Sequence, residues 1–251
     1  MKKKRLIIYT MFGIVPMLIT FLGGYKASRI LFEPSGYFLN TSSVLSQQAH
    51  LTIANFCEQI DVKKLPLQKI AYNIKERFPI IESVTIHQQP TKTLDIRCCV
   101  YTPLFNINHD MIVCASGILE PSHSFKTELI TTLPALKIDA CEITENRLHT
   151  VCYDCLASCP STLFDVYDLT WKNEAEIVLT DKKQGRFSIL SDINTINDQK
   201  KFNLYAHLKH DIMNRNDFAL NKGKQWVADI RFDNQIIIFS RGGRGYGYKT
   251  S

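Results

Sequence analysis

An uncharged apolar run close to the N-terminus constrains this chain more than any other feature of its sequence. The run extends from Leu6 to Gly24 and follows four consecutive cations, Lys2 to Arg5. About 20 apolar residues in a helix span the roughly 30 Å hydrocarbon core of a bilayer. Cations directly before such a span favour a cytoplasmic N-terminus. We therefore expect a basic cytoplasmic segment at 1–5, a transmembrane helix at 6–25 and a C-terminus on the periplasmic or extracellular side.

A cleaved signal peptide is the alternative interpretation of this run. The apolar region of a signal peptide normally covers about 7–15 residues and ends at a small-residue cleavage site. The run here is longer, and residues 23–29 do not form a small-x-small pattern. An uncleaved anchor is therefore the expectation, with a secreted binding protein as the alternative.

The charge of the chain argues against a nucleic-acid-binding protein. The formal net charge is +6, but Lys2, Lys3, Lys4 and Arg5 supply four of the 30 basic residues, and the rest nearly balance the 24 acidic ones. A domain that binds nucleic acid usually carries a basic face within the fold itself. We expect no nucleic-acid partner.

Between residues 36 and 125 the hydrophobic pattern predicts two helices followed by a small sheet. Leu67, Ile70, Ile74 and Phe78 recur at helical spacing after Pro66, and Pro79 ends that helix. An earlier helix is expected at about 43–59. Apolar residues then alternate with polar ones at 84–100, and 111–115 is a further short strand. The expectation is a linker at 26–35 and one α+β module at 36–125.

The second half of the chain predicts a β-rich domain at 126–240. Strands are expected at 176–179, 186–190, 226–232 and 235–239, with one helix at about 195–213. The tail at 241–251 is rich in Gly and Arg, and we expect it to be too flexible to pack. The fold class expected for the whole chain is α+β, with one N-terminal transmembrane helix, a first small module and a C-terminal β-rich domain.

The order of these signals resembles the bacterial cell-division family FtsQ/DivIB. The most specific stretch runs from Phe78-Pro79 through Gln89-Pro90 and Leu94-Asp95-Ile96 to Pro103 and Gly117. A second match is the strand at 226–234 with its Asp229-Ile230-Arg231 core. The chain departs from the family at Gln89-Pro90 and Tyr101-Thr102-Pro103, where the family often has an aromatic-proline pair and an acidic-basic pair. It departs again at Cys114, where an Asp is expected. The resemblance implies a POTRA module at 36–125, a single-pass protein of the inner (plasma) membrane, and partners similar to FtsB/DivIC and FtsL.

The last apolar strand is the candidate partner-binding site. An apolar edge strand normally needs protection from random pairing, and a dedicated partner is one form of protection. The alternative is a central strand that is simply core. The five candidate residues are Gln235, Ile236, Ile237, Ile238 and Phe239. Nearby, Asp229 and Arg231 share one face of their strand, which predicts a structural ion pair or a solvated face and argues against a catalytic role.

A cluster of cysteines supplies the competing hypothesis of a membrane-anchored metal or redox module. The spacing of His149, Cys152, Cys155 and Cys159 matches a four-ligand run of bacterial ferredoxins, and such ligands also suit Zn²⁺. Ferredoxins of that type need two such runs, and the chain has one. A disulfide-stapled loop that also involves Cys141 is preferred, with free thiols or a metal as alternatives. On the earlier strand Cys98 should be core, and its neighbour Cys99 should face away.

The sequence carries no motif of an enzyme. We find no nucleophile elbow, phosphate loop, metalloprotease helix or paired-carboxylate pattern. The expectation is therefore a non-enzymatic division scaffold that holds other division proteins by surface contacts. We expect it to need no cofactor, metal or small-molecule substrate.

Overall fold

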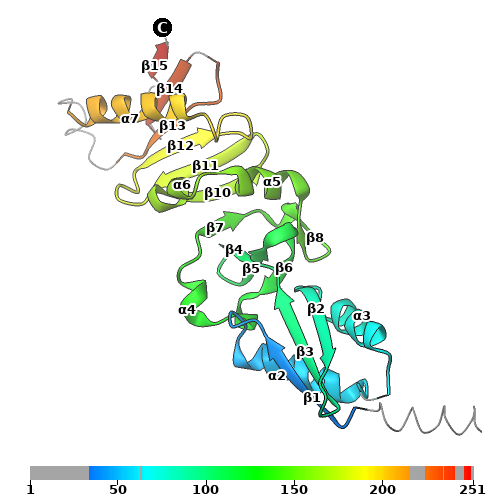
Figure 1. Ribbon diagram of the computed structural model, residues 1–251. Coiled ribbons are helices and arrows are strands. Elements are labelled where there is room, and N and C mark those ends of the chain that lie inside the picture. The colour runs from blue at the N-terminus through cyan, green and yellow to red at the C-terminus, as the bar shows by residue number, and fades with distance from the viewer. Residues whose placement is uncertain (1–33, 63, 215–223, 234, 241–245, 250–251) are drawn as a thin grey trace, which may run out of the picture. The chain divides into compact units, whose positions relative to one another are not determined.

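The computed structural model describes residues 34–62, 64–214, 224–233, 235–240 and 246–249 (Figure 1). These residues fall into two compact units. The first comprises residues up to 43 together with 50–100, and the second comprises 44–49 and the chain from Tyr101 onward. The first unit therefore ends at Val100 and not near residue 125, where the sequence pattern placed the boundary.

The first unit is a three-stranded sheet with two helices between its first and second strands. Its elements are β1 (Gly36–Thr41), α2 (Gln47–Gln59, from His50 onward), α3 (Leu67–Arg77), β2 (Ile81–Gln88) and β3 (Thr93–Val100). The strand order is β1-β3-β2, with β1 parallel and β2 antiparallel to β3. Helix α3 follows Pro66, whose missing N–H is not needed in a first turn, and it ends at Phe78 before Pro79.

Alternation along β3 divides the small sheet into an inner and an outer face. Leu94, Ile96 and Cys98 are buried, together with Ile70 and Ile74 of helix α3. On the other face Arg97 forms a bidentate pair with Asp95, whose Oδ2 lies 3.0 Å from Nε and 2.8 Å from Nη2. The predicted period-two pattern of this strand is confirmed.

The second unit is built on one ten-stranded mixed sheet with the order β15-β14-β13-β12-β11-β10-β7-β4-β5-β6 (Figure 1). The β12–β13, β10–β7 and β4–β7 pairs are parallel and the other neighbours are antiparallel. The strands are β4 (Pro103–Ile107), β5 (Met111–Cys114), β6 (Leu119–Pro121), β7 (Ala135–Ile138), β10 (Tyr167–Asn173), β11 (Glu176–Asp181), β12 (Phe187–Ser191), β13 (Trp226–Asp229), β14 (Gln235–Ser240) and β15 (Tyr246–Lys249).

Strand pairing explains why the first unit ends at Val100 and not near residue 125. Strand β4 pairs in parallel with β7, where Asn106 lies opposite Ala135 and Ile107 opposite Leu136. The Asn108 side chain adds a two-way bridge to Ile138, donating to its carbonyl at 2.9 Å and accepting from its N–H at 3.1 Å. Strands β4 to β6 therefore extend the large sheet, although they follow β3 directly in sequence.

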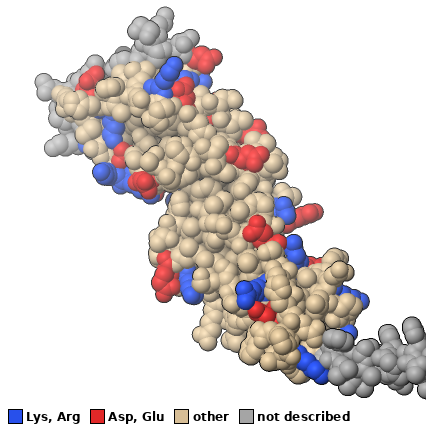
Figure 2. Space-filling view, in the orientation of Figure 1, with Lys and Arg blue, Asp and Glu red and all other residues tan. Residues whose placement is uncertain are grey.

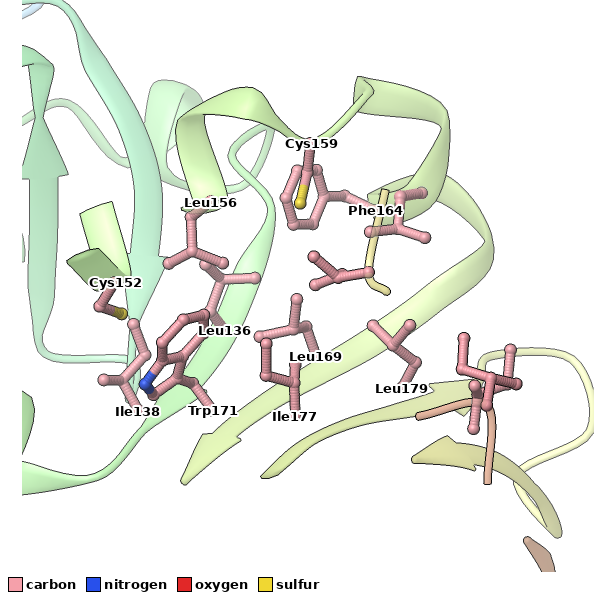
Figure 3. Packing of buried hydrophobic residues seen from close by; sticks show 14 of the residues in the cluster. Leu136, Ile138, Cys152, Leu156, Cys159, Phe164, Leu169, Trp171, Ile177 and Leu179 are labelled. Carbon is pink, nitrogen blue, oxygen red and sulfur yellow. The ribbon is translucent and has the colours of Figure 1, made fainter. Parts of the chain in front are cut away.

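Three helices cover one face of the large sheet: α5 (Thr150–Ser158), α6 (Ser161–Val166) and α7 (Gln199–Met213). Their buried residues, such as Leu156 and Phe164, belong to one cluster with Leu169, Trp171 and Ile177 of the sheet (Figure 3). The shorter elements are η1 (Ala115–Gly117), η2 (Ser122–Ser124), α4 (Thr127–Ile130), η3 (Ala140–Glu142), β8 (Ile143–Thr144) and β9 (Arg147–Leu148).

Helix α7 begins later than the sequence pattern predicted. The Asp198 carboxylate accepts from the N–H groups of Lys200 and Lys201 and so caps the first turn. Thr195 instead belongs to a preceding turn, where its N–H and hydroxyl both donate to Asp192 Oδ1. The predicted stretch at 195–198 is therefore a turn, because its polar side chains bond locally and not along a helix.

The structure corrects the expected membrane-spanning fold class and the single-pass membrane location. The predicted span at 6–25, like the segment 1–5, lies outside the described residues. Among the residues that are described, no helix is long and apolar enough to cross a membrane. Helix α7 has 15 residues, which extend about 22 Å at 1.5 Å each, and it carries Lys200, Lys209 and Asp211. The fold class that the structure supports is α+β without a membrane helix in the described part.

Charges of both signs are interspersed on the face of the molecule that Figure 2 displays. This distribution agrees with the near balance of acidic and basic residues beyond the first five positions. Within the residues that are coloured, the displayed face carries no extended basic surface of the kind that binds a phosphate backbone.

Candidate partner-binding surface

The predicted binding strand at 235–239 is not the edge of the sheet. Strand β14 lies between β13 and β15, with Ala228 opposite Ile238 on one side and Tyr246 opposite Ile238 on the other. The expectation that Gln235–Phe239 forms an exposed edge is therefore wrong. The reason is the segment at 246–249, which was expected to be flexible and instead pairs along β14.

The side chains of β14 alternate between the core and a more open face. Ile236 and Ile238 are 0% and 2% exposed and belong to the cluster beneath the three helices. Ile237 and Phe239, with Gln235, are half-buried on the other face. Cross-strand registers continue this face through Val227, which lies opposite Phe239, and through Ser188 beyond it. The β14 residues thus contribute an apolar stripe to a sheet face that the helices do not cover.

A bidentate ion pair fixes the chain between β13 and β14. Arg231 Nε donates to Asp229 Oδ1 at 2.9 Å and Nη2 to Oδ2 at 2.7 Å, which confirms the predicted pair. Arg231 Nη1 also donates to the Ala175 carbonyl at 3.0 Å. The hydrogen bonds that Arg231 donates to the Asp229 carboxylate raise the pKa of Arg231, against burial, which lowers it. The pair is structural, because its charged atoms are engaged with one another and with the backbone.

Hydrogen bonds from Lys201 join helix α7 to the same segment between β13 and β14. Lys201 Nζ donates to the carbonyls of Ile230 and Phe232, at 3.0 Å and 3.2 Å. The β13–β14 hairpin is therefore joined to the body of the unit by core side chains, by Arg231 and by Lys201. A strand carried on such a support has little freedom to shift its register.

Strand β15 is the outermost strand of the described sheet on this side, and the sequence interpretation missed it. Its registers place Lys249 opposite Gln235 and Gly247 opposite Ile237. A signal was present, because Tyr246 and Tyr248 alternate with smaller or polar residues and tyrosine favours strands. The glycines beside these tyrosines, which disfavour strands, mask that signal in the sequence.

The cysteine cluster is part of the helical layer and does not form a stapled loop. All eight cysteines of the chain are free thiols. Cys152 and Leu156 are fully buried on the inner side of α5, and Cys152 lies beside Trp171 and Ile138 (Figure 3). Burial raises the pKa of the Cys152 thiol, with the Glu142 carboxylate as a second cause. The first half of the cluster is therefore core.

The four predicted ligands are not gathered around one point. His149 precedes α5, is exposed, and has Nδ1 3.9 Å from Glu142 Oε2. Cys152 and Cys159 are two helical turns apart, and Leu156 lies between them in Figure 3. Among the described residues, no group of three His, Cys, Asp or Glu side chains could hold a metal ion. Helical spacing accounts for this, because i, i+3 and i+7 positions form a row along one side of a helix.

The two adjacent cysteines of strand β3, Cys98 and Cys99, lie as the sequence predicted. Cys98 is 2% exposed in the core of the first unit, and its neighbour Cys99 is exposed. Burial, with smaller contributions from Cys57 and Cys99, raises the pKa of Cys98 to about 12. Cys98 therefore behaves as a small apolar residue, because its thiol stays protonated at neutral pH.

An open hollow of about 500 Å³ lies beside the first turn of α5. The Ser116 N–H donates to Tyr153 Oη at 3.0 Å across its wall. The charged side chains that line it have both signs: Glu145, Arg147 and Asp154, with His149 beside them. Because carboxylates and a guanidinium both line it, the hollow has no lining of a single sign that would select a charged ligand.

Comparison with known proteins does not assign the chain to a family, because no family model and no curated protein matches it. The class of protein defined by the structure is thus an α+β protein with a small sheet-and-helix unit and a larger unit on a ten-stranded sheet.

Proposed function

We propose that this protein is a non-catalytic scaffold of the bacterial division machinery. In this proposal it binds FtsB/DivIC-like and FtsL-like division proteins through the C-terminal edge of its large sheet. The observation that carries the proposal is the position of β15, which pairs with β14 and has no second neighbour among the described strands. A strand in that position offers a row of backbone donors and acceptors that an extended partner segment can pair with.

The rigid support of this edge favours partner binding by strand addition. Ile236 and Ile238 anchor β14 in the core, and Arg231 and Lys201 hold the preceding connection. Binding to an edge that is already ordered costs less conformational entropy than binding to a site that must first become ordered. The opposite end of the sheet is a weaker candidate, because β6 has three residues and ends in Pro121, which lacks a backbone donor.

The order of elements in the first part of the chain supports the family resemblance behind this proposal. Helix α3 is followed by Pro79, β2, a turn with Pro90, β3 and Pro103, which is the order of the motif. Gly117 has a φ of +75°, a conformation that favours glycine. The resemblance contributes the identity of the partners, and the edge strand contributes the way in which they would bind.

Proline substitutions along β15 are expected to separate partner binding from folding. Successive N–H groups of a strand point to opposite sides, so Gly247→Pro and Tyr248→Pro remove one donor toward β14 and one toward the free edge. The variant that loses the outward donor should stay folded and lose at least tenfold in affinity for an FtsB/DivIC-like partner from the same organism. Affinity can be measured by biolayer interferometry, with circular dichroism to verify folding.

Ile237→Pro is the matched control, because it inserts proline into a strand that is paired on both sides. This variant should lower the melting temperature of the protein as well as partner binding. If both β15 variants remain folded and bind the FtsB/DivIC-like and FtsL-like proteins as tightly as the unchanged chain, the edge is not the binding site and the proposal is wrong.

A further inference from the structure

Cys155 and Cys159 bring two thiols together at the C-terminal end of α5. The Cys159 thiol donates to the Cys155 carbonyl, with Sγ 3.3 Å from the oxygen. The Ser158 hydroxyl donates to the same carbonyl at 2.7 Å, and the Cys159 N–H donates instead to Leu156. The helix therefore ends in a tightened turn, in which Cys159 is attached to Cys155 by its side chain.

The two cysteines of α5 and Cys159, which directly follows the helix, differ in access to solvent. Cys152 is fully buried, Cys159 is 9% exposed and Cys155 is half-buried. Contact with the Cys159 thiol lowers the pKa of Cys155, against burial, which raises it. The same contact, together with burial, raises the pKa of Cys159. Cys155 is thus the thiol more readily ionised and reached from solvent, and Cys159 is its protonated neighbour.

We propose that Cys155 and Cys159 form a reversible intramolecular disulfide by exchange with a small-molecule disulfide such as oxidised glutathione. The Cys155 thiolate attacks one sulfur of oxidised glutathione, and one glutathione thiolate leaves and takes up a proton. Cys159 then loses its proton to solvent and attacks Cys155 Sγ, which releases the second glutathione thiolate. Two protein thiols are oxidised to one disulfide, and one glutathione disulfide is reduced to two thiols.

The position of the pair explains why such a bond would be reversible. Side chains four residues apart on a helix have Cβ atoms about 5–6 Å apart, whereas a disulfide needs about 3.5–4.5 Å. Closing the bond therefore requires a shift of about 1–2 Å at the end of α5. That end can adjust, because Cys159 donates no backbone hydrogen bond to Cys155, but the bond keeps some strain. Strained disulfides are the ones that reductants open readily.

Glutathione exchange followed by peptide mapping tests this assignment on the full chain. The reduced protein is incubated with mixtures of oxidised and reduced glutathione, its remaining thiols are alkylated after denaturation, and the tryptic peptide at 148–172 is analysed by mass spectrometry. The unchanged chain should yield this peptide with two hydrogens lost, with Cys152 alkylated and with no glutathione attached. Dithiothreitol should restore both thiols. Exposed Cys141 is the internal control and should keep a glutathione adduct.

Two serine variants distinguish the attacking thiol from the one that resolves the adduct. In Cys159→Ser the glutathione on Cys155 cannot be displaced, so its occupancy should rise from near zero to near one per chain. In Cys155→Ser the peptide should keep both remaining thiols, because Cys152 and Cys159 are buried. Cys152→Ala should behave as the unchanged chain. A stable glutathione adduct on Cys155 in the unchanged chain, or a disulfide that includes Cys152, would overturn the proposal.

Discussion

Replacing Asp181 with alanine is expected to lower the free energy of unfolding by about 3–5 kcal/mol, because the change removes one partner of a buried ion pair. Asp181 lies at the end of β11, is 6% exposed, and pairs with Lys209 of helix α7. Its Oδ1 also accepts from the N–H groups of Lys183 and Gln184, at 2.9 Å and 2.8 Å. The substitution leaves the Lys209 ammonium partly buried against the Phe187 ring, 5.1 Å from its centroid.

An exposed ion pair between strand β10 and the first residue of β11 supplies the control for this variant. Lys172 and Glu176 also form a pair, but their side chains are 49% and 38% exposed. Exposed pairs contribute about 0–1 kcal/mol, so Glu176→Ala should change stability little. The measurement is urea denaturation followed by circular dichroism. Equal losses for the two variants would show that the Asp181 pair is not buried in solution.

The contribution of Asp181 should also depend on pH. Burial alone would raise the pKa of this carboxyl, but hydrogen bonds from Lys209 and from the backbone outweigh it and place the pKa below its usual value. A lowered pKa in the folded state stabilises the protein above the unfolded pKa of about 3.9, and the stabilisation is lost as the pH falls through the folded pKa. The stability difference between the unchanged chain and Asp181→Ala should therefore be complete at pH 6 and shrink below about pH 4.

Trp171→Ala is expected to cost about 3–5 kcal/mol, because it removes a large side chain from a closed part of the core. Trp171 is fully buried on β10, between Ile138 of β7 and Ile177 of β11 (Figure 3). Its indole N–H has no hydrogen-bond partner among the described residues. Trp171→Phe should therefore cost less, since it removes the unsatisfied donor and keeps most of the ring contacts.

Phe232→Ala is the comparison for the Trp171 variants, because this aromatic side chain is 42% exposed. Its effect should stay within about 0.5 kcal/mol, as for most surface changes. Urea denaturation followed by circular dichroism would rank Trp171→Ala, Trp171→Phe and Phe232→Ala by their loss of stability. A Trp171→Phe variant as unstable as Trp171→Ala would show that the indole N–H is satisfied in solution, for example by an ordered water.

Local patterns predicted the elements whose cause lies in nearby residues. Helix α3 begins after Pro66 and ends before Pro79 as expected, because proline acts on its immediate neighbours. The alternation of β3 placed Leu94, Ile96 and Cys98 on one face correctly. Spacing alone also placed Asp229 and Arg231 on one side of their strand, because residues two apart on an extended chain share a side. The structure then showed that they form an ion pair and not a solvated face.

Features that depend on distant pairing were predicted less well. The boundary near residue 125 was wrong because β4 pairs with β7, which follows β6 in the chain, and local periodicity contains no information on strand neighbours. The candidate edge at 235–239 was wrong for the same reason, because Tyr246–Lys249 adds a further strand beside it. The candidate ligand run at His149 to Cys159 had the spacing of a metal site, but folding into α5 placed its members in a row along a helix.

Residue spacing along this chain thus specifies its turns, its helix ends and the faces of its strands, since these depend on backbone sterics and on side chains a few positions apart. The strand order of the large sheet, the burial of Asp181 beneath α7 and the division between Val100 and Tyr101 depend on contacts between segments far apart in sequence. Such contacts are selected by the total apolar surface and backbone hydrogen bonding of the folded unit. Period and spacing within a single segment do not contain that information.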